Sequence, residues 1–109
     1  MSVQATLSVL AEKINENPKG ISGFQAVYQF HLSGEDGGTY QVKFADDQVS
    51  FHQGTLDEPK CILEMSDANF IKLVKGELNP TSAFMMGKLK VKGDLSLSLK
   101  LQSILQKYQ

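Results

Sequence analysis

The segment Asn79–Tyr108, NPTSAFMMGKLKVKGDLSLSLKLQSILQKY, decides the fold of this 109-residue chain. Its first part predicts a short helix. Asn79 can cap that helix, and Pro80 fits the first helical position, where its missing N–H costs nothing. Gly87 suits the left-handed conformation in which helices commonly end. We therefore expect a helix over 80–86.

The remainder of this segment predicts a strand over 88–92 and a final helix with two apolar faces. Gly93 ends the strand and Asp94 caps the helix. The leucines that follow alternate with polar residues, a strand pattern, but the later residues have helical spacing and we interpret the whole stretch as a helix. At about 100° per residue, one apolar face is formed by Leu97, Leu101, Ile104, Leu105 and Tyr108. Leu95 and Leu99 project from nearly the opposite side, so a second apolar neighbour or a guest is expected there.

The residues before this segment predict a helix followed by four short strands. Ser2 caps an amphipathic helix that Asn17 and Pro18 end. The apolar period then changes to two, which is typical of strands. The expected strands are centred on residues 24–32, 40–44, 49–51 and 61–65. Their short connections favour an antiparallel meander. In the first strand, Gln29 and His31 are expected on a mostly solvated face.

A further helix completes the expected fold. Ser66 or Asp67 caps it, and Gly76 ends it. The strand over 88–92 follows two helices, so the spacing does not indicate its neighbour in the sheet. We expect an α+β fold with a five-stranded, mostly antiparallel sheet covered on one face by helices.

Size, charge and cysteine content restrict the function. A chain of 12.0 kDa can form one domain over 1–109. Its net charge of -1 argues against nucleic-acid binding, which needs a positive surface. No apolar run approaches the roughly 20 residues that span a bilayer, and no signal peptide is visible. The single Cys61 cannot form an internal disulfide, so we expect a cytoplasmic protein. The last three residues do not match a Ser-Lys-Leu-type peroxisomal signal.

The sequence contains no recognisable catalytic or metal-binding motif. His31 and His52 have no cysteine or carboxylate at metal-ligand spacing, and exposed strand histidines are the simpler interpretation. Cys61 points with its apolar neighbours toward the covered face, as a small buried hydrophobe does. The acidic pairs fall in turns, where solvation explains them: Glu35-Asp36, Asp46-Asp47 and Asp57-Glu58. We expect no enzyme activity, no metal and no cofactor.

The C-terminal half resembles the sterol carrier protein 2 (SCP2) family. That family combines a Ser-Asp-x-x-Phe helix, a Gly-x-Leu-x-Pro-x-x-Ala-Phe-like stretch, a Gly-Lys-Leu-Lys-x-x-Gly strand and a leucine-rich helix. The matching residues here are Ser66, Asp67, Phe70, Gly76, Leu78, Pro80, Ala83, Phe84, Gly87, Lys88, Leu89, Lys90, Gly93, Leu99 and Leu101. Asn79 stands where the family often carries Asp, and either residue can cap a helix. The resemblance covers nearly the whole chain, the first half mainly through the order of its elements.

The resemblance implies a stand-alone lipid carrier with an apolar tunnel between the sheet and the C-terminal helices. The implied ligand is a fatty acid, a fatty acyl-CoA or a sterol-like amphiphile. The positions that match the tunnel wall are Phe30, Leu32, Phe84, Met85, Leu95, Leu99 and Gln102. Gln102 lies on the same side of its helix as the two outward leucines and can contact a polar head. Helical spacing alone also allows Phe84, Met85 and Met86 to be core, although methionine repacks easily around an irregular guest.

Two further alternatives remain open from the sequence. Lys88, Lys90 and Lys92 alternate with apolar residues, and a solvated strand face is the simpler interpretation. They can instead, with Lys100 and Lys107, face anionic lipid head groups during transient docking to a membrane. The second alternative is that Leu95 and Leu99 form the face of a protein-interaction or dimerisation module, or that the chain is an accessory subunit of an acyl-transferring enzyme.

Overall fold

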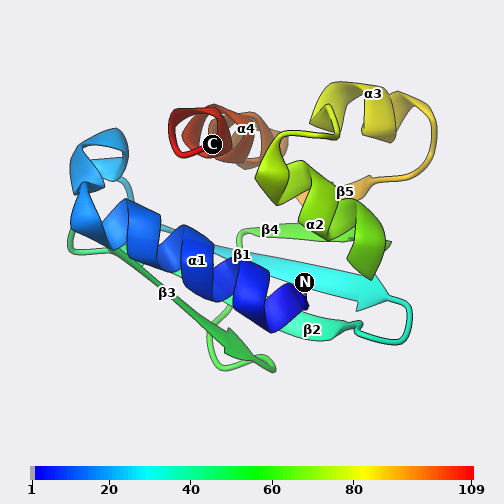
Figure 1. Cartoon of the computed structure of the whole chain (residues 1–109), viewed down its shortest axis with the longest axis horizontal. Coiled ribbons are helices and arrows are strands. Elements are labelled where there is room, and N and C mark those ends of the chain that lie inside the picture. Colours follow the sequence, from blue (N-terminus) through cyan, green and yellow to red (C-terminus); the bar gives the residue numbers. More distant parts are fainter. Residues whose placement is uncertain (1) are drawn as a thin grey trace.

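The computed structural model describes residues 2–109 as one five-stranded sheet with helices packed on it (Figure 1). The described helices are α1 (Val3–Glu16), the short 3₁₀-helix η1 (Pro18–Ile21), α2 (Asp67–Lys75), α3 (Pro80–Met85) and α4 (Leu95–Lys107). The strands are β1 (Ala26–Ser33), β2 (Gly38–Ala45), β3 (Gln48–Gln53), β4 (Cys61–Ser66) and β5 (Lys90–Gly93). The expected α+β class, element order and number of strands are confirmed.

The sheet is mostly antiparallel, as expected, but its strand order differs from a meander. The order is β3-β2-β1-β4-β5, and the pairs β1–β2, β2–β3 and β4–β5 are antiparallel. Strand β4 pairs with β1 in the parallel sense. The expected meander is therefore wrong at its fourth strand, because the loop over 54–60 crosses β2 and β1 and does not turn back beside β3.

A buried glutamine explains why that loop crosses the sheet. The Gln41 side-chain oxygen accepts hydrogen bonds from the backbone N–H groups of Leu56 and Asp57, at 3.1 and 2.9 Å. Its Nε2 donates to the Asp57 carbonyl at 2.7 Å and to Gln29 Oε1 at 2.8 Å. Gln41 is fully buried and Gln29 nearly so. The expectation that Gln29 lies on a solvated face is thus wrong. Gln29 is buried beside Gln41, from which its Oε1 accepts a hydrogen bond, and the crossing loop supplies the other hydrogen bonds of Gln41.

The helices begin where the sequence predicts because side chains satisfy their free N–H groups. Ser2 Oγ accepts from the Ala5 N–H at 3.0 Å, and Asn79 Oδ1 accepts from the Ser82 N–H at 3.1 Å. Asp94 caps α4 in the same way. After α3, Gly87 takes a φ of 74°, a left-handed conformation that glycine adopts without strain.

The core lies between the sheet and the helices, and two tyrosines tie α4 to it. Tyr28 is fully buried, and its hydroxyl donates to the Leu97 carbonyl at 2.7 Å. At the other end of α4, the Tyr108 hydroxyl donates to the Asn17 carbonyl at 2.6 Å and accepts from the Gly20 N–H at 3.0 Å. Helix α4 is therefore fixed at both ends. Within residues 2–109, none of the helices has the length and apolar content needed to cross a membrane.

Candidate functional site

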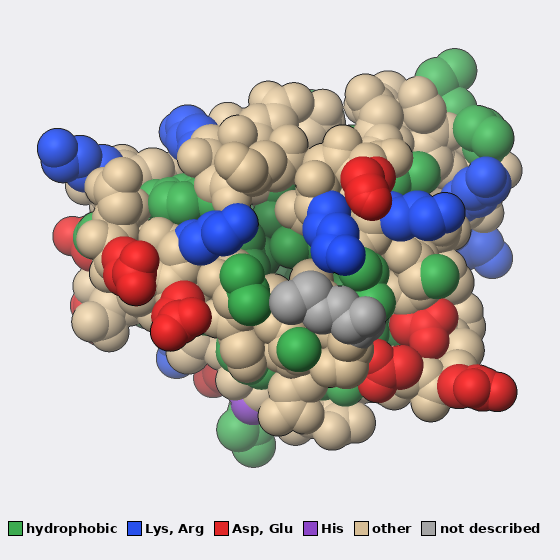
Figure 2. Space-filling view, in the orientation of Figure 1, with side chains coloured by type: hydrophobic (Ala, Val, Ile, Leu, Met, Phe, Trp, Pro, Cys, Tyr) green, Lys and Arg blue, Asp and Glu red, His purple; other side chains and the backbone are tan. Residues whose placement is uncertain are grey.

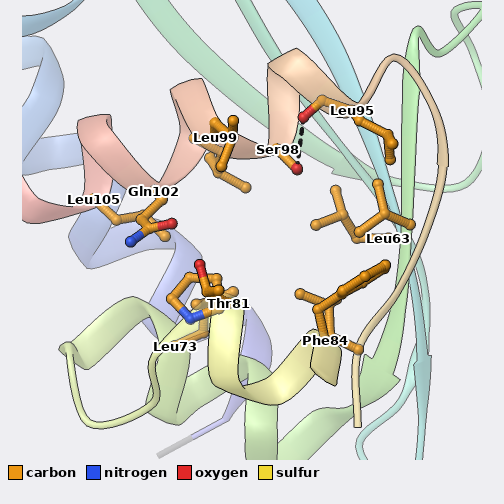
Figure 3. Close-up of a pocket in the computed structure, with 13 residues that line it drawn as sticks. Leu63, Leu73, Thr81, Phe84, Leu95, Ser98, Leu99, Gln102 and Leu105 are labelled. Carbon is orange, nitrogen blue, oxygen red and sulfur yellow. Dashed lines mark hydrogen bonds between the residues drawn. The ribbon is translucent and has the colours of Figure 1, made fainter. Parts of the chain in front are cut away.

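An apolar cavity of about 210 Å³ opens between α3, α4 and the β4–β5 edge of the sheet. Figure 3 shows its labelled side chains arranged around an open centre. Every lining side chain is uncharged, and most are aliphatic. The lining residues are Leu63, Leu73, Pro80, Thr81, Phe84, Leu89, Val91, Leu95, Ser98, Leu99, Leu101, Gln102 and Leu105. A hollow of this kind favours a hydrocarbon guest, because apolar surface is removed from water on binding.

The cavity exists because α4 carries two apolar faces. Its buried face, with Leu101, Ile104 and Leu105, packs into the core. Leu95 and Leu99 point toward α3 and remain 57% and 64% exposed, so no protein side chain covers them fully. The unpartnered face expected from the sequence is therefore present at the mouth of a cavity.

Three neutral polar side chains lie among the apolar ones. Ser98 Oγ donates to the Leu95 carbonyl at 2.7 Å, so its proton is used within the helix. In the described part of the chain, the side chains of Thr81 and Gln102 make no hydrogen bond to another protein group. Figure 3 shows them near each other on the side of the opening where α3 approaches α4. They can therefore bond to a polar group of a guest without breaking existing interactions.

The structure brings four of the seven residues expected at the tunnel wall together around this cavity. They are Phe84, Leu95, Leu99 and Gln102. Met85 is 80% exposed and does not line the cavity.

The two wall positions expected on the first strand lie elsewhere. Phe30 is in the packed core, with its ring centroid 5.0 Å from that of Phe70. Leu32 is buried near the end of β1, at a separate surface depression. Helix α4 turns its outward leucines toward α3 and β5, so the cavity lies over β4 and β5 and not over β1.

Several lining residues were missed because they depend on strand pairing. Leu63 of β4 and Val91 of β5 are opposite each other in the register and form the floor of the cavity. Alternation places each on the covered face, but the sequence does not indicate that β5 lies beside β4. Leu89 is buried and follows α3. The sequence predicted it only as part of the strand over 88–92, with no role in the cavity. The missed polar residue Thr81 had no signal beyond its place in the first turn of α3.

The titratable groups near the cavity do not form a reactive centre. Burial raises the pKa of the Cys61 thiol to about 11, with a further contribution from nearby Asp94. Burial also raises the pKa of Tyr28 well above its usual value. Hydrogen bonds from Ser96 keep the pKa of Asp94 below its usual range, so it stays ionised as a helix cap. In residues 2–109 no cluster of three or more His, Cys, Asp or Glu side chains can hold a metal ion.

The fold and nearly the whole sequence are similar to known proteins. The model of the SCP-2 sterol transfer family matches residues 7–106. The hydroxysteroid dehydrogenase-like protein 2 of Bos taurus is 36% identical over 106 residues, which are 95% of this chain and 25% of that protein. The chain thus spans about a quarter of the length of this curated relative.

Two solved structures show the same fold. The apo form of sterol carrier protein 2 from Yarrowia lipolytica matches with a TM-score of 0.71 and 26% identity, over 94% of this chain and 88% of that one. The sterol carrier protein 2 of Aedes aegypti, solved in complex with palmitate, matches with a TM-score of 0.76 and 14% identity, over 100% of this chain and 98% of that one. Because the family model covers nearly the whole chain, this protein belongs to the SCP-2 sterol transfer family.

Proposed function

We propose that this chain is a non-enzymatic carrier domain that binds the hydrocarbon part of a lipid in the cavity between α3 and α4. The observation that carries the proposal is the lining of that cavity, which holds aliphatic side chains, one aromatic ring and three neutral polar groups. The palmitate complex of the Aedes aegypti protein supports a fatty acid as the ligand class. Fatty acyl-CoA and sterol-like amphiphiles are further candidates with the same apolar chemistry.

Burial of methylene groups provides enough binding energy for a carrier. Ten buried methylenes at about 0.8 kcal/mol each contribute roughly 8 kcal/mol, nominally micromolar affinity before association costs are subtracted. Thr81 and Gln102, which line the mouth of the cavity, support hydrogen bonding to an oxygen of the head group. Methylenes offer no directional contacts, so we expect low selectivity between similar lipids.

The direct test is extraction of the purified protein with organic solvent, followed by mass spectrometry. A co-purified fatty acid or fatty acyl ester at close to one per protein would support the carrier. A stripped protein that takes up no fluorescent fatty acid at micromolar concentration would contradict it.

A matched pair of variants tests the site. Leu99→Asp places a carboxylate where the acyl chain would lie, and its desolvation should weaken fatty acid binding by at least about tenfold. Leu56→Asp is the control, because Leu56 is also a highly exposed leucine but lies on the crossing loop, outside the cavity. Equal affinities for both variants, measured by displacement of a fluorescent fatty acid, would remove the site assignment.

The surface beside the cavity mouth supports a further proposal, transient docking to an anionic membrane. Met85 and Met86 are 80% and 64% exposed and do not line the cavity. Lys88 and Lys90 follow them and are exposed, and the ion pairs found within residues 2–109 leave both without a carboxylate partner. Figure 2 shows hydrophobic and Lys side chains adjoining at the end of the molecule where α3 lies. Methionines inserting among acyl chains, with lysines at the head groups, would face the mouth toward the lipid source.

The membrane proposal is tested by the rate of lipid transfer between vesicles. Lys92 is less suitable for this test, because its Nζ is 3.0 Å from Glu64. Replacing Lys88 and Lys90 by Gln should slow transfer from phosphatidylserine-containing vesicles several-fold and leave transfer from neutral vesicles unchanged, since each lysine contributes about 1 kcal/mol near an anionic surface. The control replaces Lys72 and Lys75 of α2, which are also exposed, and has the same charge. A similar loss in both double variants would show a general charge effect.

The alternative is that the exposed Leu95 and Leu99 form a face that contacts a protein and not a lipid. The curated relatives are several times longer than this chain, so a neighbouring domain or subunit is one such partner. Light scattering of the lipid-free protein separates the two proposals. A stable dimer that Leu95→Ser with Leu99→Ser converts to a monomer would favour the interaction module.

A further inference from the structure

A second, smaller void lies in the core beside the cavity. It has room for about one water molecule, at about 10 Å³, and its lining is entirely apolar. It is bounded by α1, α2, α4 and the strands β1 and β2. Its walls include Leu10, Phe30, Val42, Phe70 and Val74, none of which lines the outer cavity.

The outer cavity and this inner void share one partition. Leu73 of α2 and Leu101 and Leu105 of α4 line both spaces. All three are buried, with 3%, 5% and 4% of their surface exposed. Leucine side chains carry no hydrogen bonds, so a change of rotamer can connect the two spaces without loss of any polar interaction.

The sheet provides a continuous apolar floor beneath both spaces. Val91 pairs with Leu63, and Leu63 pairs with Phe30, so these three lie side by side on the covered face of β5, β4 and β1. Val42 continues the floor on β2, opposite Tyr28. From β5 to β2 there are three strand spacings, a distance of roughly 14 Å. An extended polypeptide spans about 3.5 Å per residue, or roughly 1.2 Å for each of its three backbone bonds, and an extended acyl chain advances similarly per carbon. About eleven carbons are therefore needed to cross this floor.

We infer that Leu73, Leu101 and Leu105 form a gate that sets the length of the acyl chain the protein accepts. This inference rests on the proposed lipid-binding function. Without a guest, the three leucines pack together and separate the inner void from the outer cavity. This arrangement is favoured because moving them apart would lose their packing contacts. A short chain fills the outer cavity alone. A long chain displaces the leucines and extends over Phe30 and Val42 toward α1.

The gate explains how a small cavity serves a long ligand. At about 210 Å³ the outer cavity is smaller than the roughly 300 Å³ at the lower end of typical ligand sites. Each methylene that passes the gate and is buried should tighten binding by roughly fourfold. Affinity should therefore keep rising with chain length beyond the length that fills the outer cavity.

The test measures affinity for saturated fatty acids from 8 to 18 carbons by displacement of a fluorescent fatty acid. Val74→Phe fills the inner void from α2 and should weaken binding of the 16-carbon acid at least tenfold, with the 8-carbon acid within twofold of wild type. Ile71→Phe is the matched control, because Ile71 is also a partly buried residue of α2 but lies outside both spaces. Leu105→Ala should favour long chains over short ones.

A measurement on the unaltered protein avoids dependence on the folding of any variant. In methyl-labelled protein, the 16-carbon acid should shift the NMR signals of Leu10 and Val42, whereas the 8-carbon acid should shift Leu99 and leave those two unmoved. Unmoved Leu10 and Val42 signals with both acids bound, or an unchanged chain-length profile in Val74→Phe, would overturn the gate alone. Failure of the wild type to bind any fatty acid would overturn the proposed function and the gate together.

Discussion

Tyr28 and Cys61 stand opposite each other on β1 and β4, and both are fully buried beneath α4. The Tyr28 hydroxyl holds the first turn of α4 through the Leu97 carbonyl. The neutral forms of both side chains suit this environment, since burial disfavours the charged form. The neutral form of each side chain is therefore the one that the fold stabilises, and Tyr28 also anchors α4.

We predict that stability declines in alkaline solution because of this pair. The folded pKa of Cys61, about 11, lies above its unfolded value near 9.0. The contribution of the thiol to the free energy of unfolding is fully present below pH 9.0. It is lost as the pH rises to about 11, because the thiol of the unfolded chain loses its proton at lower pH than the buried thiol does. Tyr28 adds a further loss that begins as the pH rises above its unfolded pKa of 10.0, because its pKa is also raised by burial. Urea denaturation between pH 7 and 11 should show a decrease on the order of 2 kcal/mol from the thiol.

The contrast with Cys61→Ala tests this assignment. The variant loses some packing at every pH, so its stability is compared with its own value at pH 7. Its decline between pH 9 and 11 should be clearly shallower than that of the wild type. Parallel curves for the two proteins would assign the alkaline loss to other groups.

Residue roles were predictable from sequence where the partner is local. Ser2, Asn79 and Asp94 cap their helices as expected, because each bonds to a backbone group two or three residues ahead. Gln41 was not predictable, since its partners lie on a loop more than a dozen residues away. A polar residue at an alternating strand position indicates solvent unless a later segment covers it.

At the scale of elements, α3 is the least anchored part of the cavity wall. The hydrogen bonds of residues 79–87 found in the described structure stay within 79–89. The helix is attached to the core mainly by Ala83, which is 1% exposed, and by Leu89 after it. Helix α4, in contrast, is bonded at both ends to other elements. We therefore expect α3 to open locally while α4 stays in place.

Loss of the α3 cap should show this local opening. Asn79→Ala removes the bond to the Ser82 N–H, at a cost of about 1 kcal/mol to the helix. Amide exchange at Ala83 and Met86 should then be about fivefold faster, and bound fatty acid should dissociate faster by a similar factor. The stability of the whole chain to urea should change by less than about 0.5 kcal/mol, because the core unfolds separately.

Asn79→Asp serves as the control, since aspartate caps a helix as well as asparagine does. It should keep the slow exchange and slow dissociation of the wild type. An Asn79→Ala protein that loses the full 1 kcal/mol of global stability, with no selective exchange in α3, would show that α3 belongs to the cooperative core.

Element order and type could be predicted from sequence, but the pairing of strands could not. Periodicity gave each strand of the sheet and both faces of α4, which is why Leu95 and Leu99 were expected to need a neighbour. Strand β4 pairs with β1 through contacts far apart in the chain, which no local pattern records. The cavity floor, Leu63 with Val91, follows from that pairing and was therefore missed.

At the scale of the molecule, the core is closed at one end and hollow at the other. At the end where α1 meets η1 the side chains are closely packed, as the buried Ile14 and Ile21 illustrate. At the α3 end, the cavity leaves Phe84, Leu95 and Leu99 largely exposed. A lipid at this end would complete the core, so the folded state without lipid is the less stable of the two.

Ligand binding should consequently raise the thermal stability of the whole chain. A fatty acid that binds the folded protein alone, at 100 times its Kd, stabilises it by about 2.7 kcal/mol. For a domain of this size each kcal/mol corresponds to roughly 4 °C, so we expect Tm to rise by about 10 °C. Differential scanning calorimetry of stripped protein with and without a 16-carbon acid measures the shift. Leu56→Asp should show the full rise. Leu99→Asp should show about half of it or less at the same lipid concentration, because tenfold weaker binding leaves only about 1.4 kcal/mol of stabilisation. Equal shifts in both variants would place the stabilising lipid outside the cavity between α3 and α4.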